Sequence, residues 1–79
     1  MKIRVFVTLK PGVLDPQGEA VKHSLGSLGF AGVNAVHQGK VIELEIDETD
    51  AGKAEAQAKD MCEKLLANTV IENYLVEIL

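Results

Sequence analysis

The chain has 79 residues, of which 47% are hydrophobic and 25% are charged. This balance is typical of a soluble globular protein and is too apolar for a disordered segment, so we expect a single domain over residues 1–79. Twelve acidic residues against eight basic ones give a formal net charge of −4, and the lack of a basic stripe argues against nucleic-acid binding. No signal-like leader is apparent, and no apolar run approaches the roughly 20 residues of a membrane span. We therefore expect a cytoplasmic protein without membrane contact.

The first two elements predicted are a strand and a helix. Apolar and polar residues alternate over residues 2–10, which is the pattern of a strand with one buried face. The side chains expected to face the core are Ile3, Val5, Val7 and Leu9. Asp15 is a suitable N-cap, and Pro16 suits the first position of a helix. We predict that this helix ends near Leu28, with Gly29 as its left-handed C-terminal cap.

The middle of the chain contains two weaker extended stretches, residues 33–37 and residues 40–47, separated by Gln38-Gly39. They are consistent either with a hairpin or with one long bent strand. In the second stretch the apolar residues expected to face the core are Ile42, Leu44 and Ile46. The residues between them are mainly acidic, which is typical of a sheet covered on one side only.

The last third of the chain predicts a second helix and a final strand. Thr49 or Asp50 is the expected N-cap of the helix. Its predicted buried stripe consists of Ala54, Ala58, Met61 and Leu65. Residues 72–79 then alternate as a strand, with core-facing residues Tyr74, Val76 and Ile78. The order βαββαβ predicts an α+β two-layer sandwich on a ferredoxin-like plan, a four-stranded sheet with two helices on one face.

Residues able to perform chemistry are few and scattered. Cys62 lies in the middle of the second helix beside acidic residues that disfavour a thiolate, so we interpret it as a buried structural thiol, and as a lone cysteine it excludes an intramolecular disulfide. His23 and His37 have no His/Cys cluster around them and are interpreted as surface or half-buried histidines. We therefore predict no catalytic, cofactor-binding or metal-binding residue in this chain.

Two further patterns were weighed and given structural interpretations. The acidic run at residues 47–50 lacks the ligand spacing of a calcium loop and suits the N-terminus of a helix. The GxxG tetrad at residues 26–29 resembles the nucleic-acid clamp of KH modules, but it falls at a helix end and has no basic residue beside it. Helix capping is the better account of these glycines.

The segment Lys10–Gly18, with sequence KPGVLDPQG, resembles the segment that PurS subunits of phosphoribosylformylglycinamidine synthase carry between their first strand and first helix. The resemblance covers essentially the whole chain in register. It continues through residues 28–30, 39–44, 65–68 and 70–74. Chain length and the order of elements agree with this family as well.

The resemblance implies a role in a three-part enzyme that makes formylglycinamidine ribonucleotide for purine biosynthesis from formylglycinamide ribonucleotide, ATP and glutamine. A glutaminase subunit, PurQ, would release ammonia, and a synthetase subunit, PurL, would bind ATP and magnesium and add that ammonia. PurS-like subunits would pair with themselves, as a dimer or a dimer of dimers, hold PurQ and PurL together and assist ammonia transfer. No cofactor is expected in this chain.

Partner contacts are predicted on two surfaces. Phe6 and Val41 lie on the sheet face opposite the helices, where apolar patches suit a protein partner. The turns on either side of the first helix supply the other candidates, which are Lys10, Pro11, Gly12, Asp15, Gly39 and Lys40. These turn residues are explained equally well by turn and cap chemistry. A ligand-sensing module of the ACT type, which shares the βαββαβ plan, is the alternative function.

Overall fold

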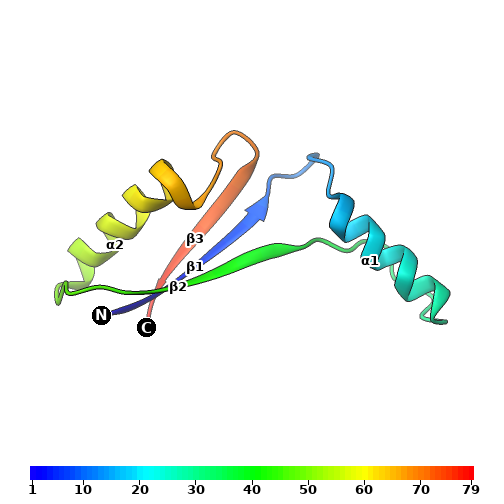
Figure 1. Cartoon of the computed structure of the whole chain (residues 1–79), viewed down its shortest axis with the longest axis horizontal. Coiled ribbons are helices and arrows are strands. Elements are labelled where there is room, and N and C mark those ends of the chain that lie inside the picture. The colour runs from blue at the N-terminus through cyan, green and yellow to red at the C-terminus, as the bar shows by residue number, and fades with distance from the viewer.

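A three-stranded antiparallel sheet with strand order β2-β1-β3 forms the body of the protein in a computed structural model that describes residues 1–79 (Figure 1). The elements in chain order are β1 (Lys2–Leu9), α1 (Pro16–Ser27), β2 (Gly39–Glu45), α2 (Ala51–Met61), the π-helical turn η1 (Cys62–Leu66) and β3 (Glu72–Ile78). Both predicted helices and the first and last predicted strands are confirmed. No helix has the length and apolar character needed to cross a membrane.

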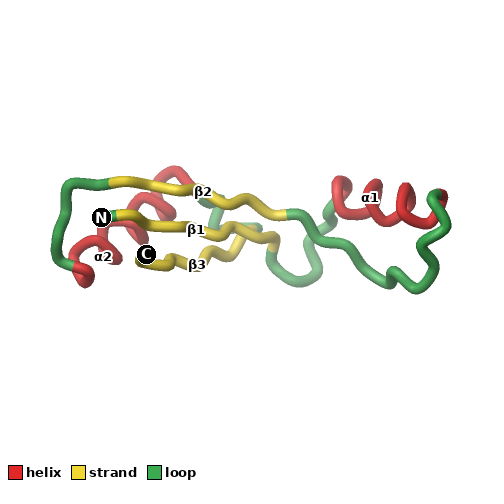
Figure 2. Tube along the Cα trace, turned by 90° about the horizontal axis from the view of Figure 1, so that it is seen from below, coloured by secondary structure: helices red, strands yellow, loops and turns green.

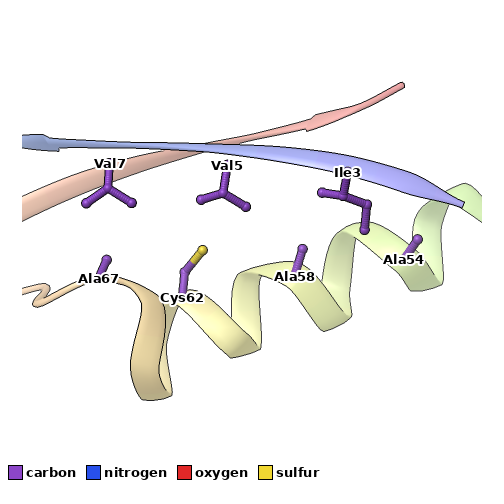
Figure 3. Packing of buried hydrophobic residues seen from close by; sticks show 7 residues of the cluster. All are labelled: Ile3, Val5, Val7, Ala54, Ala58, Cys62 and Ala67. Carbon is purple, nitrogen blue, oxygen red and sulfur yellow. The ribbon is translucent and has the colours of Figure 1, made fainter. Parts of the chain in front are cut away.

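The core lies between β1 and α2. β1 pairs with a strand on each side, so its inward side chains are fully buried, namely Ile3, Val5 and Val7. The side chains that meet them from α2 and the segment after it are small, namely Ala54, Ala58, Cys62 and Ala67 (Figure 3). Small residues allow the helix to approach the sheet closely, which compensates for the few large side chains in this core.

The predicted stripe of the second helix is correct at Ala54 and Ala58 and wrong at Met61 and Leu65. Met61 is half-buried, Leu65 is 83% exposed, and Cys62 occupies the next core position instead. The step from Ala58 to Cys62 is an ordinary helical spacing of four, and η1 changes only the step after it. Its wider turn places Ala67 rather than Leu65 next in the core, since the N–H of Ala67 donates to the carbonyl of Cys62 at 3.0 Å, five residues back. The buried residues therefore follow spacings of four, four and five.

The predicted four-stranded sheet is wrong in this structure, since residues 33–37 form no strand and the chain makes no hairpin at Gln38-Gly39. The register gives the reason. Gly39 lies opposite Thr8, close to the end of β1, so residues that precede Gly39 extend past the point where β1 can offer hydrogen bonds. The stretch continues the direction of β2 without a neighbouring strand.

The predicted placement of both helices on one sheet face is also wrong within a single chain. α2 packs against β1 and β3, whereas α1 and the loop that follows it extend beyond the end of the sheet (Figures 1 and 2). The molecule measures 48 × 24 × 15 Å as a result. We call residues 13–38, which contain α1 and the returning chain, the arm.

Candidate partner-binding surfaces

Asp15 connects the two ends of the arm. Its Oδ1 accepts a hydrogen bond from the N–H of Gly18 at 2.8 Å, which is the N-cap predicted from the sequence. Its Oδ2 accepts a second bond from the N–H of Gln38, also at 2.8 Å, where the chain returns to the sheet. The carboxylate is buried, so it holds the start of α1 and the start of β2 together without solvent between them.

These hydrogen bonds lower the pKa of Asp15 below its ordinary value. The bond from Gly18 contributes most, followed by the bond from Gln38, and the nearby His37 adds a smaller favourable charge effect. Desolvation acts in the opposite direction and is outweighed. The carboxylate is therefore ionised throughout the physiological pH range, which strengthens both hydrogen bonds.

Two glycines allow the backbones to approach at the base of the arm. A Cβ on Gly18 would lie 2.2 Å from the carbonyl oxygen of Val36, so α1 and the returning chain touch through bare backbone there. A Cβ on Gly39 would lie 2.6 Å from the carbonyl oxygen of Val7, at the first residue of β2. Both distances are far inside van der Waals contact, which gives a physical reason for glycine at each position.

The structure brings together some of the predicted contact residues. Asp15, Gly39 and Lys40 line one depression of about 270 Å³ between the sheet and the arm. The Lys40 ammonium lies 4.0 Å from a carboxylate oxygen of Glu72 on the wall of this depression. A neighbouring depression of about 230 Å³ is lined by the second group of predicted residues, Lys10, Pro11 and Gly12, with Leu9, Val13 and His37.

Phe6 and Val41 lie elsewhere, on the sheet face that no helix of the chain covers. They are register partners, and Leu75 of β3 is the partner of Phe6 on its other side. Val41 is 57% exposed and Leu75 is 64% exposed, so the three side chains make an apolar row across the sheet. We call this row the outer row. Leu75 was missed as a candidate, although its alternation with core-facing Tyr74 and Val76 would have placed it there.

The next residues along the same face carry charge. Arg4 lies in register between Glu43 and Glu77, and its guanidinium is 3.7 Å from a carboxylate oxygen of Glu43. The outer row is therefore bordered on one side by mixed charges. An apolar centre with a polar border is the usual composition of a protein-binding surface.

The groups considered for chemistry do not assemble into a site. Cys62 is buried as predicted, and burial, followed by the charge of Glu63, raises the pKa of its thiol. Burial also raises the pKa of Tyr74, whose hydroxyl donates to Glu63 at 3.2 Å. Both histidines are exposed, as predicted. No group of three His, Cys, Asp or Glu residues is arranged to hold a metal ion.

The chain is similar to PurS proteins both in sequence and in structure. The family model for PurS, described as phosphoribosylformylglycinamidine (FGAM) synthase, matches residues 2–79. A PurS subunit of this synthase from Synechocystis is 53% identical over 95% of this chain and 75% of its own length. The structure of Bacillus subtilis PurS is 51% identical and superposes with a TM-score of 0.85 over 96% of this chain and 94% of its own. A chain in the structure of PurLQS from Thermotoga maritima is 35% identical and superposes with a TM-score of 0.88, covering 99% of this chain and 95% of its own.

Proposed function

The chain belongs to the PurS family of FGAM synthase subunits in purine biosynthesis, and from this membership we propose that it is a non-catalytic subunit that joins PurQ to PurL. The observation that carries the proposal is the match to a chain of the Thermotoga maritima PurLQS structure, which extends over 99% of this chain. A chain with the same fold over its full length can present its strands and helices to partners in the same arrangement.

In this proposal the residues that react with glutamine and with ATP belong to PurQ and PurL. PurQ releases ammonia from glutamine, and PurL binds ATP and magnesium and transfers the ammonia to formylglycinamide ribonucleotide. The two reactions need neighbouring sites, because ammonia that enters solvent is diluted and protonated. A subunit that binds both partners raises the effective concentration of one site at the other without forming or breaking a bond itself.

The depressions at the base of the arm and the outer row are the surfaces we assign to such contacts. Asp15 and its two hydrogen bonds hold the first surface in a fixed shape, and a fixed shape lowers the entropy lost on binding. The outer row offers exposed apolar side chains on a rigid sheet.

The protein also pairs with itself, as a dimer or a dimer of dimers, and acts in the cytoplasm.

Reconstitution of the enzyme tests this function. Purified PurQ and PurL from the same source would be assayed for FGAM formation with glutamine, and separately with ammonium salt, in the presence and absence of this chain. We expect the glutamine-dependent rate to require the chain and the ammonia-dependent rate to be independent of it. Unchanged glutamine-dependent activity without the chain would refute the proposal.

The isolated chain provides the control. It should turn over neither glutamine nor ATP. The ligand-sensing alternative predicts that the isolated chain binds an amino acid, and calorimetry against amino acids at millimolar concentration distinguishes the two functions. The match to the PurS family over residues 2–79 favours the subunit role.

A further inference from the structure

A third depression, of about 320 Å³, lies at the end of the sheet where β1 finishes, η1 finishes and β3 begins (Figure 1). The chain is fixed there by a hydrogen bond of 2.8 Å from the N–H of Lys10 to the carbonyl of Ile71. The side chains that line the depression are mostly polar, namely Lys10, Glu63, Thr69, Glu72, Asn73 and Tyr74. We call it the polar depression, and its lining suits a different kind of contact from the apolar outer row.

Glu72 places a largely buried carboxylate on the wall of the polar depression. Its side chain is only 14% exposed. One oxygen, Oε1, accepts a hydrogen bond of 2.7 Å from the N–H of Asn68 and so holds the turn before β3. The other oxygen, Oε2, accepts no hydrogen bond within the chain and is paired only with the Lys40 ammonium, 4.0 Å away. Oε2 is therefore an acceptor with little water around it and without a close donor.

Two further side chains of the depression have acceptors to spare. Glu63 accepts from the Tyr74 hydroxyl through Oε1 alone, and the Asn73 amide is exposed. Lys10 is the one cation in the lining, and it forms no ion pair within 4.0 Å. The depression therefore favours a positively charged group. A guanidinium suits it better than an ammonium, because its planar fork of five N–H donors reaches several acceptors at once.

A second copy of this chain is a poor source of that guanidinium. The only arginine in the sequence is Arg4. It lies on the outer face of the sheet, in register between Glu43 and Glu77, with its guanidinium 3.7 Å from the Glu43 carboxylate. The chain also has a formal net charge of −4, so two copies repel each other at long range. The cation is therefore expected from a different protein.

The charges of the substrates favour one of the two partners. In the function proposed above, PurL handles ATP and a ribonucleotide, which are both anionic. Sites for anionic substrates collect basic side chains around them. The substrate of PurQ, glutamine, has no net charge. An acidic surface is thus complementary to PurL rather than to PurQ.

We propose that the polar depression receives an arginine side chain of PurL, with the guanidinium on Oε2 of Glu72 and the acceptors of Glu63 and Asn73 beside it. The proposal rests on the subunit role stated above and names the partner and the chemistry for this surface. An arginine in a desolvated pocket that is already shaped to receive it is a common origin of binding energy in protein interfaces. The hydrogen bond from Asn68 to Glu72 supplies that shape in advance.

Binding of the chain to purified PurL measures the contact. In Glu72→Gln the amide oxygen can still accept from the N–H of Asn68, so the turn should persist while the charge is lost. We expect the Kd for PurL to rise about 10- to 100-fold in calorimetry and the Kd for PurQ to change less than about twofold. An unchanged Kd for PurL, or a loss of PurQ binding in its place, would overturn the proposal.

Two further variants separate a direct contact from a general change of charge. Glu55→Gln removes the same charge from α2, where Glu55 pairs only with Lys59, and should change the Kd for PurL less than about twofold. Lys10→Gln removes a cation that would repel the guanidinium, so the Kd should stay the same or fall up to about fivefold. A loss of affinity in either variant as large as that in Glu72→Gln would contradict an arginine as the occupant.

The dependence on salt gives a readout that a merely structural role of Glu72 would not change. Raising sodium chloride from about 50 mM to about 500 mM should weaken the binding of PurL to the unmodified chain more steeply than to Glu72→Gln. Equal slopes would mean that the substitution removed no contact between charges, and the proposal would fail.

These results are separable from the subunit role. If Glu72→Gln binds PurL like the unmodified chain while the glutamine-dependent activity still requires the chain, the function stands and the arginine contact is wrong. If the unmodified chain binds neither PurL nor PurQ, both proposals fail.

Discussion

Substituting alanine for glycine at two positions in α1 should have opposite effects, because the two glycines have different surroundings. Gly26 has no atom within 4 Å of the position where a Cβ would lie, whereas a Cβ on Gly18 would lie 2.2 Å from the Val36 carbonyl oxygen. Alanine favours a helix over glycine by about 0.8–1.0 kcal/mol. Gly26→Ala should therefore stabilise the arm by up to about 1 kcal/mol.

Gly18→Ala gains the same helix propensity but must separate two backbones. Relief of the overlap requires a shift of about 1 Å in either α1 or the returning chain, and overpacking of this kind costs about 1–3 kcal/mol. The same Cβ would lie 2.8 Å from Oδ2 of Asp15, the oxygen that accepts from Gln38. We therefore expect a net destabilisation of the arm of about 1–2 kcal/mol and a weakened bond to Gln38.

Amide hydrogen exchange measures this effect locally. The N–H groups of Gly18 and Gln38 should exchange about 5- to 30-fold faster in Gly18→Ala and no faster in Gly26→Ala. The amides of β1 serve as an internal reference, because the core between β1 and α2 does not involve the arm. Equal protection in the two variants would show that the close backbone approach at Gly18 is not a constraint, and the account of the arm base would be wrong.

Three further results are expected. The pKa of Asp15 is lowered on folding, so the stability that its carboxylate gives the arm should be complete above the unfolded value of 3.8 and be lost as the pH falls through the lower folded pKa. Faster exchange of the Gln38 amide in that acid range would show the loss, and Asp15→Asn should remove this dependence of arm stability on pH. Cys62→Ser should lower the free energy of unfolding in urea by about 1–3 kcal/mol, because a hydroxyl replaces a buried thiol among apolar neighbours, while a stability equal to wild type would mean that the site is hydrated. Leu65→Ala should change stability by less than about 0.5 kcal/mol and Ile3→Ala by about 2–5 kcal/mol, and a cost at Leu65 as large as that at Ile3 would support the buried stripe that the sequence predicts.

Local patterns predicted the elements well. The alternation in β1 identified its three fully buried residues, and Asp15 and Asp50 cap the helices that follow them. The predicted C-terminal cap at Gly29 is confirmed by its positive φ of 93°. Each of these features depends on a few neighbouring residues, so the sequence contains enough information to find it.

The errors arose where distant segments meet and where the helical period changes. The bond from Gln38 to Asp15 joins residues 23 apart, and no local pattern indicates it. The burial of Ala67 in place of Leu65 depends on η1, whose wider turn breaks the helical period from which the stripe was predicted. Alternation in the final strand implied the outward position of Leu75, but its pairing opposite Phe6 required the strand order.

The sequence alone determined the two helices, the first and last strands, the family, and the buried positions of Ile3, Val5, Val7, Ala54 and Ala58, because capping, side-chain alternation and a long motif are properties of contiguous residues. The tertiary structure decided that residues 33–37 have no strand to pair with and that α1 lies beyond the sheet. The reason is geometric: β1 is already paired on both sides and ends near Gly39, and the Asp15 carboxylate holds the arm at that end. Hydrophobic periodicity shows which side of a helix is apolar, but only the packed chain shows which surface that side can reach.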